Sequence, residues 1–137
     1  MSERNPLPVR GFLMHITHYD PSWYAEKDAE TPFDPALGLD VIKAMAKVDL
    51  NLLVIDCADG VAYASHPELR RGYTVPLSTL ADLAEAARER DIEVVPKLNF
   101  SQSHYHHHND WFRPYHELFD NEEYWQRAFQ LIDELIA

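Results

Sequence analysis

The chain has 137 residues, enough for one domain but only about half of the roughly 250 residues in a closed (β/α)8 barrel. Hydrophobic residues make up 46% and charged residues 26%, which is an ordinary globular composition. With 23 acidic against 12 basic residues, the formal charge is -11, so a phosphate backbone or an anionic membrane surface would be repelled. We therefore expect neither nucleic acid nor a membrane as partner.

The N-terminus and the single cysteine bear on the cellular compartment. The stretch "MSERNPLPVR" lacks the apolar core of a secretory signal, and no segment approaches the ~18 continuous apolar residues of a membrane span. A cytoplasmic location is the default expectation, and a longer secreted precursor stays compatible with it. Cys57 cannot form an internal disulfide and lies in an apolar run, which favours a buried free thiol over a nucleophile.

The first predicted unit is a strand followed by a helix. The near-continuous apolar run "GFLMHI", from Gly11, is typical of a strand covered on both faces in a parallel sheet. The stretch "DPALGLDVIKAMAKVDL" then predicts a helix in which Asp34 is the N-cap and Pro35 occupies the first turn. Its predicted apolar face consists of Leu39, Ile42, Met45 and Ala46.

The second unit repeats this order. A strand, "LLVIDCA", begins at Leu52, and a helix is predicted in "STLADLAEAARERD" with Ser78 as its cap. The spacing i, i+3, i+4, i+7 predicts an apolar face of Leu80, Leu83, Ala84 and Ala87.

The third unit has the strand "IEVVPKL", from Ile92, and the helix "DNEEYWQRAFQLIDELIA". Asp120 and Glu123 have the spacing of a capping box. The predicted inward stripe consists of Trp125, Ala128, Phe129, Ile132 and Leu135. Asp133 and Glu134 are predicted on the solvated face of this helix.

Strands that alternate with helices require parallel pairing through right-handed crossovers. The sequence therefore predicts an α/β fold of three consecutive βα units with parallel strands, forming one domain over residues 1–137. Either an open sheet or a segment of a barrel satisfies this pattern. No G-x-G-x-x-G occurs and the chain has four glycines, so no dinucleotide or phosphate-loop site is expected, and no cofactor.

Long loops follow all three predicted strands. Residues 17–33, 58–76 and 99–119 leave the carboxyl ends of the strands, where parallel α/β folds place their sites. Polar residues in or near these loops are the candidate site: Arg10, His15, His18, Asp56, Asp59, Lys97, Asn99 and the histidines from His104 to His108. Arg10 differs from the others in position, because it opens its strand.

Three stretches, taken in order, have a familiar arrangement: "VRGFLMHITHYD", "DVIKAMAKVDLNLLVIDCADGVAYASHPEL" and "YTVPLSTLADLAEAARERDIEVVPKLN". They resemble the Arg-Gly first strand and the second and third βα units of glycoside hydrolase family 20, the β-N-acetylhexosaminidases and their relatives. The resemblance extends from about Val9 to Asn99. It implies the N-terminal part of a (β/α)8 barrel that binds carbohydrate.

The resemblance assigns sugar binding to two residues. Arg10 stands where the family's arginine binds hydroxyls of the terminal sugar, and the alternative is an arginine tied to a carboxylate at the strand entrance. Asp59 matches the first residue of the family's Asp-Asp pair, with Gly60 at the second. Other positions depart from the pattern, namely His15 for an Asp, Asp56 for a His, and Lys97 with Asn99 in the Pro-Glu-Ile-Asp stretch.

The family's catalytic Asp-Glu pair follows its fourth strand, whereas this sequence reaches a third helix. We therefore expect these residues to contribute to sugar binding without hydrolysing a glycoside by that mechanism. Three strands also leave two open sheet edges, which predicts either a longer parent protein or self-association.

The loop "SQSHYHHHND" contains four histidines and permits three interpretations. It could form the rim of a sugar pocket, with His104 and nearby aromatic residues, or bind a metal, or be a solvated loop. The leading hypothesis is a sugar site of Arg10, His15, Asp56, Asp59, Lys97, Asn99 and His104, without metal. The alternatives are a non-catalytic carbohydrate-binding or interaction module, and a metal-dependent hydrolase that uses His15, His18, Asp56 and Asp59.

Overall fold

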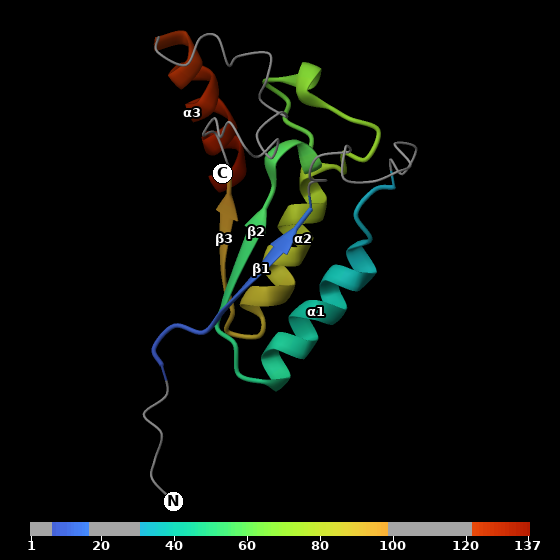
Figure 1. Cartoon of the computed structure of the whole chain (residues 1–137), viewed down its shortest axis with the longest axis vertical. Coiled ribbons are helices and arrows are strands. Elements are labelled where there is room, and N and C mark those ends of the chain that lie inside the picture. The colour runs from blue at the N-terminus through green and yellow to red at the C-terminus, as the bar shows by residue number, and fades with distance from the viewer. Residues whose placement is uncertain (1–6, 17–30, 99–121) are drawn as a thin grey trace, which may run out of the picture.

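The computed structural model describes residues 7–16, 31–98 and 122–137 of the chain. Three parallel strands form one sheet in the order β1-β2-β3, with bounds β1 Gly11–His15, β2 Leu52–Asp56 and β3 Glu93–Lys97. The helices are α1 Pro35–Lys47, α2 Leu77–Arg88 and α3 Glu122–Ile136. Two short 3-10 turns, η2 Ala58–Gly60 and η3 Pro67–Leu69, lie between β2 and α2 (Figure 1). The predicted α/β fold of three βα units with parallel strands is confirmed.

Helix α1 begins where the sequence predicts. The Asp34 side chain accepts a hydrogen bond from the backbone N–H of Ala36 at 2.9 Å, and so satisfies one of the donors that a helix N-terminus leaves without an intrahelical partner. The buried residues are Gly38, Ile42 and Met45, whereas Ala46, predicted inside, is exposed. Gly38 leaves room for its neighbours, because a Cβ there would lie 2.8 Å from the ring of Phe33 and 2.9 Å from a methyl carbon of Leu83 in α2.

Helix α2 corrects one prediction about its start. Its N-cap is Pro76, which makes no capping side-chain bond, and Ser78 lies inside the first turn. Leu80, Leu83 and Ala87 are buried as predicted, because they share one face at helical spacing.

Helix α3 is rotated relative to the prediction. Ala128 is buried and Leu135 packs on the core, as predicted, but Trp125 and Phe129 are 44% and 58% exposed, and Tyr124 and Leu131 are buried in their place. Both sets of residues have helical spacing, so α3 carries two adjacent apolar stripes. Only the stripe that contains Tyr124 packs on the described core. The capping-box prediction involves Asp120, which lies outside the described residues.

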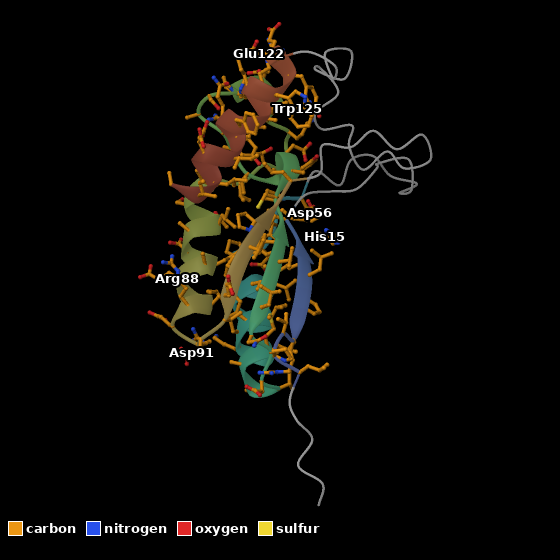
Figure 2. The ribbon with its side chains drawn as sticks, turned by 90° about the vertical axis from the view of Figure 1, so that its left-hand side faces the viewer. His15, Asp56, Arg88, Asp91, Glu122 and Trp125 are labelled. Atoms are coloured by element: carbon orange, nitrogen blue, oxygen red, sulfur yellow. The ribbon has the colours of Figure 1, made fainter. Side chains whose placement is uncertain are left out.

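The two faces of the sheet differ in what covers them. Leu53 and Ile55 of β2 point toward α1 and α2 and are fully buried. On the other face, Leu13 and Val95 flank Val54 in one register layer and are 44% and 41% exposed. Figure 2 shows α2 on one side of the sheet, and no described helix covers the other side. This arrangement, with helices outside and an apolar layer inside, is that of a barrel wall.

None of the helices in the described part of the chain has the length and apolarity that a membrane crossing requires.

Candidate functional site at the carboxyl end of the sheet

The parallel register aligns three of the predicted site residues. His15 is the partner of Asp56 in the β1–β2 ladder, and Asp56 is the partner of Lys97 in the β2–β3 ladder. Each is the last residue of its strand, and all three lie on the face opposite the helices. Side chains in one register layer stand about 4.8 Å apart from strand to strand, so the three groups are in contact range. His15 and Asp56 are labelled together at this end of the sheet in Figure 2.

Asp56 is the centre of this group, which we call the strand-end cluster: His15, Asp56 and Lys97. Its Oδ2 atom accepts a hydrogen bond from Lys97 Nζ at 2.9 Å and lies 3.2 Å from His15 Nδ1. The Asp56 side chain is 1% exposed, whereas those of Lys97 and His15 are 37% and 38% exposed. The carboxylate is therefore buried beneath the two nitrogen-bearing side chains, which reach the surface.

The contact with Asp56 determines the tautomer of His15. An ionised carboxylate can only accept, so the Nδ1 atom that faces it carries a proton. In a neutral imidazole the lone pair is then on Nε2. An imidazole oriented in this way can accept a proton or a hydrogen bond at Nε2.

The turn that follows β2 comes directly after Asp56 and is fixed by a buried tyrosine. Ala58 has a positive φ of 38°, a conformation that is costly for a residue with a Cβ. The buried Tyr63 hydroxyl donates to the carbonyl of Ala58 at 2.6 Å. Burial raises the pKa of Tyr63, and the nearby charges of Asp59 and Asp56 raise it further. The phenol thus stays protonated and keeps the strained turn in place.

Cys57 is a buried free thiol, as predicted. Burial raises its pKa to about 12, and the negative charge of Asp56 adds to this effect. Its Sγ atom lies 3.3 Å from the carbonyl of Ile55, to which the thiol donates. A thiol in this state is a poor nucleophile.

Asp59 is held by residues of the loop that follows η2. Tyr73 donates its hydroxyl to Asp59 Oδ2 at 2.6 Å, and Arg71 Nε lies 3.4 Å from the same oxygen. The backbone carbonyl of Asp59 accepts from the Thr74 hydroxyl at 2.7 Å. Sequence reasoning assigned no role to Arg71 or Tyr73, although "YT" at 73–74 opens one of the stretches that resemble the hexosaminidases.

Arg10 lies at the other end of the sheet. Its Nε donates to the carbonyl of Asp49 at 2.6 Å, and a terminal guanidinium nitrogen lies 3.2 Å from the Asp49 carboxylate. The five residues from Arg10 to His15 correspond to about 16 Å of strand. The structure therefore does not bring Arg10 together with the strand-end cluster, and its contacts match the alternative of an arginine tied at the strand entrance.

Helix α3 braces the loop between β2 and α2. Glu134 accepts hydrogen bonds from the backbone N–H groups of Ala64 at 2.7 Å and Ser65 at 2.8 Å. His66, which is buried, lies 2.8 Å from Gln130 through Nε2. The prediction that Glu134 lies on a solvated face is wrong, because its carboxylate replaces water as the acceptor for these two donors.

Other predicted site residues fall outside the described part of the chain: His18, Asn99 and the histidines from His104 to His108. Within the ranges that the structure does describe, no group of three or more His, Cys, Asp or Glu side chains could hold a metal ion.

These features define a segment of a parallel α/β barrel wall with a polar cluster at its mouth. No family model matches the chain, and no curated protein is matched by its sequence. Among solved structures, it is similar to Streptomyces plicatus N-acetyl-β-hexosaminidase in complex with Thio-NAglucal, with 17% identity and a TM-score of 0.50. The match covers 67% of this chain and 19% of that chain. This chain thus shares the fold of about a fifth of that enzyme.

Two further structures are similar at lower TM-scores. A mutant of the same Streptomyces plicatus enzyme, in complex with the product GlcNAc, has 17% identity and a TM-score of 0.49, covering 66% of this chain and 19% of that chain. An exo-β-N-acetylglucosaminidase of glycoside hydrolase family 20 from Vibrio harveyi has 18% identity and a TM-score of 0.45, covering 66% and 16%.

Proposed function

We propose that this chain is a wall segment of a carbohydrate-active barrel and that the strand-end cluster contributes to its sugar-binding mouth. One observation carries the proposal: His15, Asp56 and Lys97 end three adjacent strands in one register layer of the inward face. Ligand sites of parallel α/β barrels form at this end of the strands. Asp59, with its partners Arg71 and Tyr73, belongs to the same end and extends the proposed mouth.

The role proposed for the cluster is binding. Asp56 Oδ2 already accepts from Lys97 and faces His15 Nδ1, so its part is to orient these two side chains. Asn99 and His104 remain proposed members of the mouth, since both follow β3. In a hydrolase, the catalytic carboxylates would come from other strands of the completed barrel.

Completion of the barrel is the second part of the proposal. The layer of Leu13 and Val95 is nearly half exposed, which is costly for apolar side chains. A cavity of about 350 Å³ adjoins β3 and α3, lined by Pro96, Leu98, Ile132, Leu135 and Ile136. A closed barrel of this class has eight strands, whereas two copies of this sheet would supply six and three copies nine. Further βα units, rather than copies of this chain, fit the remaining positions.

Saturation-transfer NMR tests sugar binding by the purified chain. Methyl glycosides of glucose, galactose and N-acetylglucosamine serve as ligands. We expect transfer to at least one of them, and a weaker signal for Asp56→Asn and His15→Gln. Arg88→Gln is the control, because Arg88 lies on α2, on the helix side of the sheet and away from His15 and Asp56 (Figure 2). If neither these neutral glycosides nor any acidic sugar shows transfer, the proposed function is refuted.

The exposed apolar face of the sheet, opposite the helices, can be tested separately. Because Leu13 and Val95 are exposed, we expect the chain to enhance the fluorescence of the apolar dye ANS. Replacing both residues with glutamine should reduce this enhancement while the circular dichroism of the helices is kept. Sedimentation showing a stable dimer that these changes dissociate would instead support self-association.

A further inference from the structure

At the carboxyl end of the sheet, carboxylates are buried and cations lie outside them. Asp56 is 1% exposed beneath Lys97, and Asp59 is 4% exposed beneath Arg71, which is 39% exposed. Lys97 is exposed to a similar extent, at 37%. At these two ion pairs a ligand would therefore meet N–H donors, and the acceptor oxygens lie below them.

The two ion pairs belong to one surface region. Asp56 and Asp59 are three residues apart, on either side of the turn that begins at Cys57. The Tyr63 hydroxyl holds that turn through its hydrogen bond to the carbonyl of Ala58. Three residues of chain span at most about 11 Å, so the two ion pairs belong to the same neighbourhood of the strand ends.

The donors of this region exceed what their partners use. A lysine ammonium has three N–H groups, and Lys97 gives one of them to Asp56. Arg71 faces Asp59 through Nε. A guanidinium has five N–H donors in a planar arrangement that matches a carboxylate or a sulfate, so the other donors of Arg71 can serve a ligand. His15 also reaches this surface, but in its neutral form Nε2 is an acceptor, so the surplus donors are those of Lys97 and Arg71.

Neutral sugars present hydroxyls that both donate and accept, so their sites commonly offer acceptors as well as donors. This surface offers mainly donors, with positive charge outermost. We infer that the mouth selects a sugar bearing an oxyanion substituent, either a carboxylate, as in a uronic acid, or a sulfate. The inference rests on the proposed function and deepens it by naming the substrate class.

The net charge of the chain does not oppose this selection at short range. The formal charge of -11 repels an anion at a distance, but salt at about 0.15 M screens charges beyond about 8 Å. Within that distance a ligand meets Lys97 and Arg71 before the carboxylates, because these cations are the exposed members of their pairs.

The test compares matched ligands on the full chain, by calorimetry or by NMR titration. The ligands are methyl β-glucuronide, its methyl ester, methyl β-glucoside and glucose 6-sulfate. We expect the glucuronide or the sulfate to bind about tenfold more tightly than the ester and the glucoside, and this preference to shrink as salt is raised. The ester keeps the ring and removes the charge, so this comparison needs no change in the protein.

Variants then assign the preference to residues. Lys97→Gln and Arg71→Gln should each lower the ratio of acidic to neutral affinity, Lys97→Arg should keep it, and Arg88→Gln should leave it unchanged. Equal binding of the acid, the ester and the glucoside would overturn the inference and leave the proposed function standing. If none of the four ligands nor the neutral sugars binds, the proposed function fails and the inference fails with it.

Discussion

Breaking the pair between Lys97 and Asp56 should destabilise the fold measurably. Leaving a buried polar group without one of its partners costs about 1–3 kcal/mol. Lys97 is 37% exposed and His15 remains on the same oxygen, so we expect Lys97→Met to cost about 1–2 kcal/mol, in the lower half of this range. For a domain of this size, that corresponds to a fall in the melting temperature of about 4–8 °C.

A double-mutant cycle isolates the interaction. Asp56→Asn alone should also destabilise, and the double variant Asp56→Asn/Lys97→Met should lose less than the sum of the single losses, by about 1 kcal/mol. Urea denaturation followed by circular dichroism measures each free energy of unfolding. The matched control is Lys43→Met, since Lys43 makes an exposed pair with Asp40 at 3.3 Å, and its loss should stay within about 0.5 kcal/mol. Strict additivity in the cycle, or equal losses for Lys97→Met and Lys43→Met, would refute the reasoning.

Three further predictions follow from local geometry and from pKa shifts. Asp91 has a φ of 57° after the end of α2, so Asp91→Gly should raise the free energy of unfolding by about 0.5–1 kcal/mol. Asp82→Gly, inside the helix, should instead lower it by about 0.3 kcal/mol, and urea denaturation measures both changes. Burial would raise the pKa of Glu134, but its hydrogen bonds to residues 64 and 65 outweigh burial and hold the pKa below the usual 4.5. The stability that Glu134 contributes is therefore present above pH 4.5 and is lost as the pH falls through the lowered pKa. In an acid titration followed by circular dichroism, Glu134→Gln should lose less stability than the parent protein. With a pKa raised to about 12, Cys57 should not react with Ellman's reagent at pH 8 in the native protein and should react fully in urea, and rapid native labelling would show that the thiol is accessible.

Much of the fold could be read from local patterns. The apolar runs located all three strands to within a residue of their starts at Gly11, Leu52 and Glu93. The Asp34-Pro35 pair located the start of α1, because capping and the fixed φ of proline act within one turn of chain. Alternation of strand and helix then required parallel pairing, and so placed the strand ends at one edge of the sheet.

Local patterns failed where two packing surfaces competed. Tyr124 and Trp125 both begin apolar stripes on α3, and spacing cannot tell which stripe faces the core. Tertiary packing buries the stripe that begins at Tyr124, whereas Trp125 stays 44% exposed. Glu134 was misjudged for a related reason: its partners are backbone groups 69 and 70 residues away in sequence.

The candidate site shows the same division. By itself, the sequence placed His15, Asp56 and Lys97 near the carboxyl ends of the three predicted strands, each as a polar residue within an apolar run. Only the tertiary structure decided that these three share one register layer and one carboxylate oxygen, and that Arg10 lies about 16 Å away at the opposite end. The physical reason is that a shift of one residue in strand register turns a side chain to the other face, and register depends on contacts between strands about forty residues apart.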